Sequence, residues 1–350
     1  MLCCSRMFQT NIIYTYELIA ISTIFVECVN YVLISNYQNI KRVKDCTSIM
    51  AKQMDENNCE FVCSRGILKL CDIYSSNPVS SIPYVRDYNF SNFQSGMSIY
   101  IASTALRDFL GWIDMIPGKF ILVTGDCDIC VPNDVFPNQA DFVKFIENPK
   151  LIRWHSQNCI GNHPKLHQIP IGLDYHTMSV GDHSWGPKTP PVKQEEMLKR
   201  ITQNAEPFWN RINGCYANFQ FLMTTRFSYD RGDAINNVPR ELVYYEPTKT
   251  TRENCWNTQV TYAFVLSPHG NGLDCHRTWE ALCLGCIPIV KTSSLDPLYD
   301  GLPVLIVKEW SDVNVYLLTN TIIKFKTIAQ ANEFTYENLR LDYWMKQINA

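Results

Sequence analysis

Residues 262–290 read Tyr262-Ala-Phe-Val-Leu-Ser-Pro-His-Gly-Asn-Gly-Leu-Asp-Cys-His-Arg-Thr-Trp-Glu-Ala-Leu-Cys-Leu-Gly-Cys-Ile-Pro-Ile-Val290. The pattern predicts a strand over 262–266, a glycine-containing loop, a helix over 274–284 that stops at Gly285, and a strand over 287–290. A strand–loop–helix–strand unit of this kind is the building block of α/β domains with a parallel sheet.

The helix of this unit has an apolar face and a charged face. Four residues with helical spacing are expected to face the core: Trp279, Leu282, Cys283 and Cys286. Arg277 and Glu280, three residues apart, share another face near the helix start. Gly270 and Gly272 allow a tight turn before the helix, and Asp274 is expected to be its N-cap. Free amides and the positive end of the helix dipole then favour an anion bound at this loop.

Outward from this unit, strands and helices alternate in two separate sets. In the first set we expect strands over 120–124, 151–154 and 167–171 and a helix over 141–147, followed by a proline- and glycine-rich loop over 179–192 and a helix over 194–212. In the second set we expect strands over 219–224, 242–245, 262–266, 287–290 and 304–307 and a helix over 251–260, and the chain is expected to end in a helix over 336–348. This order predicts two doubly wound, Rossmann-like α/β domains facing a cleft, over 1–210 and 211–325, with a C-terminal helical segment over 326–350.

Composition narrows the class of protein. Of 350 residues, 46% are hydrophobic and 19% are charged, which is typical of a globular chain. The net charge of −3 argues against a nucleic-acid partner. The 15 cysteines are scattered, and Cys127-x-x-Cys130 lacks a second pair at zinc spacing, so no metal site is expected.

The N-terminal stretch from Ile12 to Ile34 is largely apolar and long enough to span a membrane. It contains Glu17 and Glu27, which are costly within a bilayer, so a packed helix is favoured over an anchor. A signal peptide is not indicated. Membrane association and compartment, whether cytoplasmic or Golgi, are left open at this point.

The run Arg277-x-x-Glu280-Ala-Leu-x-x-Gly285-Cys-Ile-Pro288 resembles the signature of exostosin-type glycosyltransferases. The wider stretch from Phe264 to Trp310 is similar to exostosin-like transferases of microbes and large viruses, with weaker similarity at 169–174 and at Arg226.

The resemblance implies the two-domain GT-B fold and transfer of a sugar from a nucleoside-diphosphate sugar, expected to be UDP-linked, to a hydroxyl of a glycan or glycoprotein. It implies no cofactor besides the donor and no catalytic metal. By resemblance, Arg277 would bind the diphosphate and Glu280 the ribose. The other residues expected at the donor are His269, Gly270, Asn271, Gly272 and Arg226.

One position departs from the family's pattern. Many retaining enzymes of this fold carry a glutamate eight residues before the helix glutamate, and here that residue is Gly272. The departure favours an inverting mechanism, which needs a general base from the first domain. Asp126 and Asp128 follow the strand over 120–124 and are the candidates, with Asp128 preferred. His155 is an alternative base, and either aspartate could instead cap the next turn.

Other interpretations compete with this one. Arg277 and Glu280 could pair with each other on a solvated helix face. Arg226 and Arg231 could reach a phosphate or lie in a solvated loop. Cys275, at a helix start, could be the nucleophile of a hydrolase beside His276. The fold could also have lost catalysis and bind a nucleotide sugar or glycan without transferring it.

Overall fold

The computed structural model describes residues 34–38, 40–42, 50, 54–221 and 224–350. The chain forms two compact units, residues 1–54 and 55–350, and the second contains both sheets. The apolar stretch predicted over 12–34 lies outside the described residues except for its last residue. Among the helices that the structure describes, none combines the length and apolar character that crossing a membrane requires.

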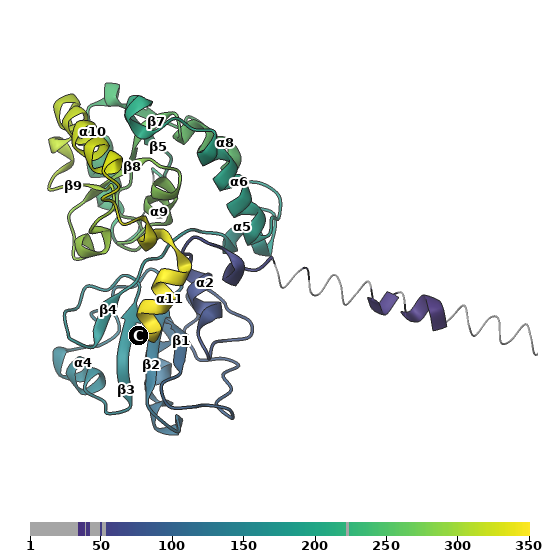
Figure 1. Cartoon of the computed structure of the whole chain (residues 1–350). Coiled ribbons are helices and arrows are strands. Elements are labelled where there is room, and N and C mark those ends of the chain that lie inside the picture. The colour runs from purple at the N-terminus through teal and green to yellow at the C-terminus, as the bar shows by residue number, and fades with distance from the viewer. Residues whose placement is uncertain (1–33, 39, 43–49, 51–53, 222–223) are drawn as a thin grey trace, which may run out of the picture. The chain divides into compact units, whose positions relative to one another are not determined.

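The first sheet has four parallel strands in the order β1-β2-β3-β4. The strands are β1 (Ser98–Ala102), β2 (Phe120–Gly125), β3 (Leu151–Ser156) and β4 (Leu166–Gln168). The helices of this part are α2 (Ser64–Leu70), α3 (Leu106–Leu110) and α4 (Gln139–Ile146), and the short helix α5 (His176–Val180) follows in the chain. Figure 1 shows this sheet beside α2, α4 and α11.

The second sheet has five parallel strands in the order β6-β5-β7-β8-β9. The strands are β5 (Ile212–Ala217), β6 (Val243–Tyr245), β7 (Tyr262–Leu266), β8 (Ile287–Lys291) and β9 (Leu305–Val307). The helices are α6 (Pro191–Gln203), α7 (Ser228–Asn237), α8 (Arg252–Gln259), α9 (His276–Cys283) and α10 (Val315–Gln330). The chain passes from β5 to one side, at β6, and then to the other, at β7. Such a reversal leaves a crevice at the carboxyl ends of the two strands.

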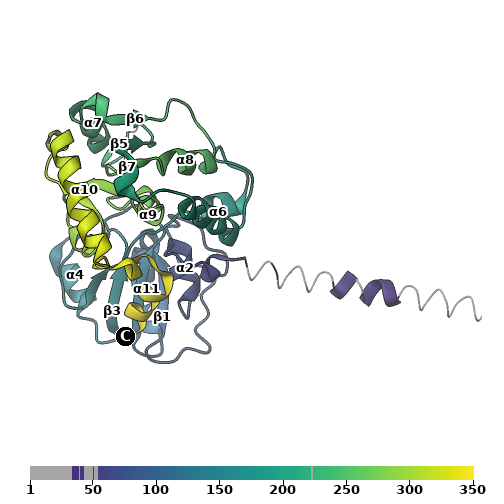
Figure 2. The same cartoon turned by 45° about the horizontal axis from the view of Figure 1, so that its top comes forward.

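The last helix, α11 (Leu341–Asn349), returns to the first sheet and contacts α2 and β2 (Figure 2). The helix predicted over 336–348 is therefore two elements: a 3-10 turn over Tyr336–Leu339 and α11. Arg340 between them has extended backbone and pairs antiparallel with Phe61. This strand-like pairing interrupts the helix, because the extended backbone of Arg340 cannot continue it.

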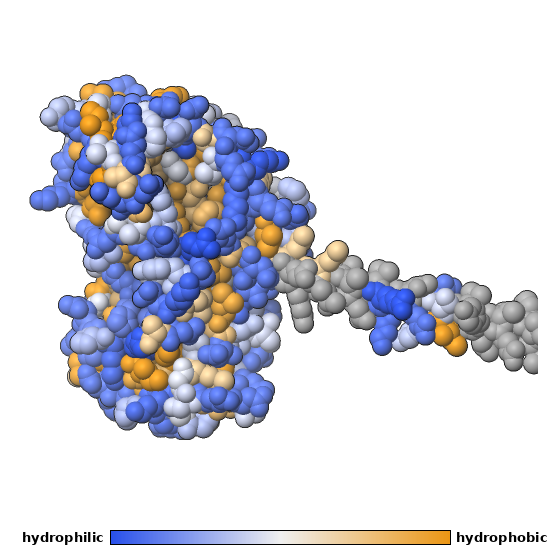
Figure 3. Space-filling model, viewed as in Figure 1, coloured by the Kyte–Doolittle hydropathy of each residue, from blue (hydrophilic) through white to orange (hydrophobic). Residues whose placement is uncertain are grey.

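Alternating side chains of the strands point to opposite faces of each sheet and belong to separate apolar cores. In β2, Phe120 and Leu122 face one core with α3 and α4, while Ile121 and Val123 face another. This second core also contains residues of α6, α8 and α9, so it connects the first sheet with the helices of the second. Residues of α7 and α10 pack on the opposite face of the second sheet. Figure 3 shows that hydrophilic residues cover most of the face drawn there, with apolar residues in separate patches. The mixed α/β architecture with two parallel sheets, each covered by helices on both faces, agrees with the Rossmann-like prediction.

Some element boundaries differ from the prediction. The helix expected over 194–212 starts earlier and ends at Gln203, and Pro207 follows at a short distance. The first strand of the second sheet along the chain is β5, and not the segment expected over 219–224. Residues 222–223 of that segment are not among the described residues. β4 ends at Gln168 rather than at 171, because Pro170 lacks an amide hydrogen for the ladder. β1 and α10 were not among the expected elements.

His155, the alternative base, is a buried residue of the first sheet. It lies in register between Val123 and His167, and its ring stacks on that of His167 with 5.0 Å between centroids. Burial, with a smaller contribution from His167, lowers the pKa of His155 to about 3. Its imidazole is therefore neutral at physiological pH and is held inside the sheet rather than offered to a cleft.

We expect His155→Gln to make folding less sensitive to acid. The folded pKa of about 3 lies below the unfolded value, so the unfolded chain binds the extra proton as the pH falls below about 6.5. Between these values wild type loses stability on acidification by up to about 1.4 kcal/mol per pH unit from this residue. Urea denaturation at pH 7 and pH 4.5 measures the difference for wild type, His155→Gln and the surface control His183→Gln. Equal acid losses in wild type and His155→Gln would contradict this account.

Candidate functional site

The candidate site lies where the order of the second sheet reverses. The loop after β7, residues 267–275, leads directly into α9. The four residues predicted to face the core from this region, Trp279, Leu282, Cys283 and Cys286, are all buried. The predicted strand–loop–helix–strand unit is thus confirmed, with α9 starting two residues later than expected.

The sequence predicted Asp274 as the N-cap of α9, but the N-cap is Cys275. No side chain forms a capping hydrogen bond with this helix. The Asp274 carboxylate instead accepts hydrogen bonds from Ile171 N at 2.7 Å and from Trp279 Nε1 at 2.8 Å. Burial raises its pKa to about 6. The Asp274 carboxylate also interacts with the backbone of Cys275 at the helix start.

Arg277 and Glu280 do not pair with each other. Arg277 Nη1 donates to Pro268 O at 3.1 Å and to Ser267 Oγ at 3.3 Å. Among the described residues, no carboxylate lies within ion-pair distance of Arg277, whereas Glu280 Oε1 lies 3.6 Å from Arg252 Nη2. The interpretation of a simple surface pair is therefore wrong, and in the described part of the chain the Arg277 guanidinium is hydrogen-bonded to neutral oxygens.

A second arginine lies beside Arg277. Arg231 on α7 donates to His269 O at 3.2 Å and to Gln220 O at 3.1 Å. Both guanidinium groups approach the ring of Phe219, at 5.9 Å for Arg231 and 5.1 Å for Arg277. Burial and then the charge of Arg277 lower the pKa of Arg231. Two mutually repelling cations at an uncapped helix N-terminus would both be stabilised by a bound anion.

The glycines of the loop are constrained by close neighbours. A Cβ on Gly270 would lie 2.5 Å from Arg231 Nη2. A Cβ on Gly272 would lie 3.1 Å from the Asn158 amide group and 3.2 Å from Asp128 O. Gly270 thus lets the arginine approach, and Gly272 lets the loop pack against the first sheet's residues.

Asp128 contacts this loop, and Asp126 does not. Asn271 Nδ2 donates to Asp128 Oδ2 at 2.8 Å. Asp126 is buried with a φ of 52°, and its Oδ1 accepts from Ser80 Oγ at 2.7 Å. Its Oδ2 lies 3.5 Å from Arg65 Nε. Of the two carboxylates predicted as bases, the structure therefore brings Asp128 to the glycine loop and holds Asp126 in a separate buried cluster.

Glu280 is held by a buried arginine that the sequence analysis did not single out. Arg252 lies between the rings of Trp185 and Trp256, at 4.8 and 5.3 Å, and donates to Gln194 Oε1 at 2.6 Å. Burial raises the pKa of Glu280, while Arg252 acts in the opposite direction. The Glu280 side chain is 17% exposed, so an outer ligand can still reach it.

Two histidines lie near the start of α9. His176 Nδ1 is 3.1 Å from Asp174 Oδ1, and the rings of His176 and His276 are 6.0 Å apart. His276 Nδ1 donates to Gly172 O at 2.7 Å. Burial lowers the pKa of His176. His276 was noted from the sequence, but His176 was missed, because the residues around 174 and 276 come together only through the packing of the two sheets.

The remaining predicted residues have local partners. His269 Nδ1 donates to Leu273 O at 2.8 Å, and its backbone N donates to Asp230 Oδ2, so His269 shapes the loop. Arg226 forms an ion pair with Asp134. Burial raises the pKa of Cys275, contrary to the lowered value expected at a helix start. This removes the basis for a thiolate nucleophile.

No metal cluster accompanies these groups in the described part of the chain, where no three His, Cys, Asp or Glu residues are arranged to hold an ion. The eleven cysteines of that part are all free thiols. Comparison of the sequence with models of known families and with curated proteins found no match.

We expect Gly270→Ala to weaken anion binding without unfolding the protein. The added methyl group would displace the Arg231 guanidinium from its position beside Arg277. Isothermal titration with pyrophosphate should show at least a tenfold loss of affinity, about 1.4 kcal/mol. Gly232→Ala is the matched control, because it lies next to Arg231 on α7 and its Cβ meets nothing within 4 Å. Wild-type affinity in Gly270→Ala would argue against an anion at this loop.

Proposed function

We propose that the protein is a glycosyltransferase of the GT-B type that binds a nucleoside-diphosphate sugar at the loop before α9. The observation that carries the proposal is the pair Arg231 and Arg277 at the uncapped start of α9. This pair sits at the carboxyl edge of a parallel sheet whose strand order reverses there. Ligands of open α/β sheets bind at such a reversal. The resemblance of residues 264–310 to exostosin-type transferases supports the same assignment.

A diphosphate suits this site chemically. Two guanidinium groups supply paired donors and fixed positive charge, and the helix start adds backbone amides. As the bond between the anomeric carbon and the diphosphate oxygen breaks, the electron pair passes to the diphosphate. Arg231 and Arg277 would stabilise the charge that grows there.

Glu280 would accept hydrogen bonds from the ribose hydroxyls. Its position three residues after Arg277 places it one helical turn from the diphosphate site. The nearby guanidinium of Arg252 favours its ionised form. UDP is the expected nucleotide.

Asp128 would serve as the general base of an inverting transfer. Its carboxylate lies at the glycine loop, 2.8 Å from Asn271 Nδ2. The acceptor oxygen attacks the anomeric carbon while its proton passes to Asp128. The glycan or glycoprotein hydroxyl would therefore approach between the Asp128 loop and the donor.

The donor assignment predicts selective stabilisation by one nucleotide. Thermal unfolding is measured with UDP, GDP, CDP and ADP. A diphosphate at a hundred times its Kd stabilises the fold by about 2.7 kcal/mol. The shift should disappear in Arg277→Ala and persist in Arg200→Ala, whose arginine pairs with Glu253 on the surface. If no nucleotide shifts wild type, or if Arg277→Ala responds as wild type does, the donor assignment is wrong.

The base assignment predicts a separation of binding from catalysis. Asp128→Asn keeps the side chain's shape but cannot take the acceptor proton, so transfer should fall by about 10²- to 10⁴-fold. Nucleotide binding should stay within a few-fold of wild type. Asp114→Asn, an exposed change in the same half, should be fully active. If wild type binds nucleotide but neither transfers nor hydrolyses the donor, the protein is a binding protein of the same fold.

A further inference from the structure

Arg252, the first residue of α8, packs against two tryptophan rings. Its guanidinium lies 4.8 Å from the centre of the Trp185 ring and 5.3 Å from that of the Trp256 ring. Trp256 follows four residues later on the same side of α8, and the backbone N of Arg252 donates to Trp185 O at 2.8 Å. The Arg252 side chain is only 5% exposed, so its charge requires partners inside the protein.

The polar partners of Arg252 come from three other segments of the chain. The guanidinium donates to Gln194 Oε1 on α6 at 2.6 Å and to the backbone oxygen of Asp174. Its Nη2 lies 3.9 Å from Asp174 Oδ2 and 3.6 Å from Glu280 Oε1 on α9. A planar guanidinium with five donors can serve several such acceptors at once. The segment before α5, α6 and α9 therefore all meet at this one group, which fixes its position relative to Glu280.

The charge of Glu280 depends on this guanidinium. Burial raises the pKa of Glu280, and of the neighbouring charged groups Arg252 opposes this effect most strongly. His276 acts in the same direction as Arg252, and Asp174 acts in the opposite direction. The Glu280 side chain is 17% exposed, so the carboxylate is partly open to a ligand while Arg252 lies behind it.

We infer that Arg252 is a positioning residue that makes the donor site selective for ribonucleotides. The inference rests on the proposed function, in which Glu280 accepts from the ribose hydroxyls. Both neighbouring hydroxyls of a ribose can donate to one carboxylate that is held in a fixed orientation. Without Arg252 the carboxylate could turn towards a single hydroxyl or take up a proton, and it would no longer distinguish ribose from 2′-deoxyribose.

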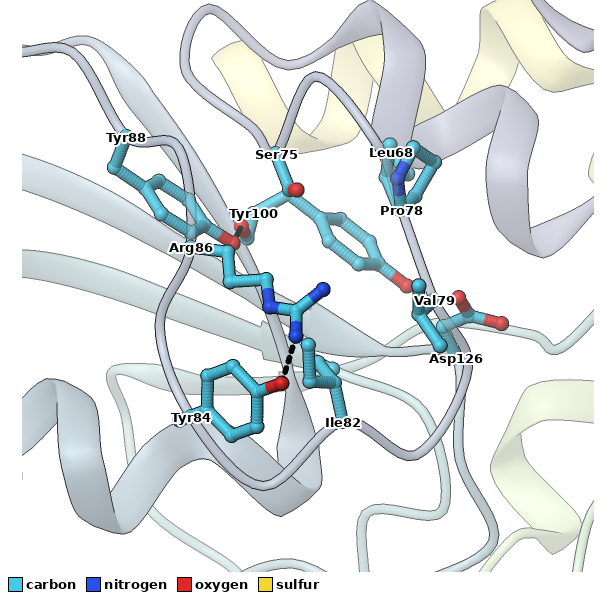
Figure 4. A pocket seen from close by; sticks show the side chains of 11 residues that line it. Leu68, Ser75, Pro78, Val79, Ile82, Tyr84, Arg86, Tyr88, Tyr100 and Asp126 are labelled. Atoms are coloured by element: carbon cyan, nitrogen blue, oxygen red, sulfur yellow. Dashed lines mark hydrogen bonds between the residues drawn. The ribbon is translucent and has the colours of Figure 1, made fainter.

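The test compares the binding of UDP, 2′-deoxy-UDP and pyrophosphate to the full-length protein by isothermal titration. Arg252→Met removes the guanidinium but keeps an unbranched side chain between the two rings. Glu280→Gln shows what loss of the carboxylate itself does. The matched control is Arg86→Met, because the Arg86 guanidinium also lies over an aromatic ring, 4.6 Å from the centre of Tyr84, but in the exposed segment before β1 (Figure 4).

We expect wild type and Arg86→Met to bind UDP at least tenfold more tightly than 2′-deoxy-UDP, because the deoxy compound leaves a charged acceptor without one donor. In Arg252→Met and Glu280→Gln this preference should fall below about threefold. The affinity of Arg252→Met for pyrophosphate should stay within about threefold of wild type, since Arg231 and Arg277 are unchanged. A merely structural role of Arg252 would instead weaken the binding of all three ligands alike.

Arg252→Lys gives the answer should Arg252→Met fail to fold. A lysine keeps the positive charge but lacks the planar fork, so the preference for UDP should fall at least threefold. If the folded variant keeps the full preference of wild type, or loses pyrophosphate and UDP affinity by the same factor, the inference is overturned and the donor site stands.

The remaining outcomes separate the inference from the proposed function. If wild type prefers UDP but Glu280→Gln keeps that preference, Glu280 is not the ribose contact, and the role of Arg252 falls while the diphosphate site stands. If wild type binds pyrophosphate but no UDP, or none of the three ligands, the donor assignment itself fails and the inference fails with it.

Discussion

The buried carboxylate of Asp274 joins the segments on which the candidate site depends. Its two oxygens accept from Ile171 N and from Trp279 Nε1, and its own backbone N donates to Asn158 Oδ1 at 2.9 Å. One residue thus ties the segment after β4, the loop after β3 and the start of α9 together. A buried carboxylate is tolerated only when such donors surround it. Because they come from both sheets' segments, the position of the glycine loop is set by the packing of the two halves.

The arrangement of charge follows from this packing. Arg231 and Arg277 donate to carbonyl and hydroxyl oxygens and both approach the ring of Phe219, and the charge of Arg277 lowers the pKa of Arg231. The buried carboxylates nearby are engaged elsewhere: Glu280 with Arg252, and Asp230 with Trp310 and the backbone of His269. The fold therefore brings two guanidinium groups to the loop, where the Asp128 carboxylate also lies and acts on the pKa of Arg231 in the opposite direction to Arg277.

Burial also decides which candidates cannot act. The thiol of Cys275 stands at a helix start, where the dipole lowers a thiol pKa, but desolvation has the larger effect and raises it. His155 stands next to the end of its strand, yet desolvation holds it neutral inside the sheet. The position of each residue along the chain suggested a reactive group, but burial in the folded protein determines the pKa of both.

The sequence by itself determined the local units of this protein. The strand over 262–266, the helix with its apolar face at Trp279 and Leu282, and the helix over 251–260 follow from periodicity and glycine positions, which act between near neighbours in the chain. Only the tertiary structure decided that Glu280 meets Arg252 rather than Arg277. It also decided that Asp128 rather than Asp126 reaches the loop, and that Asp274 bonds Ile171 instead of capping its helix. These contacts depend on the strand order of each sheet and on how the two sheets pack, and no local pattern specifies which distant residues that packing brings together.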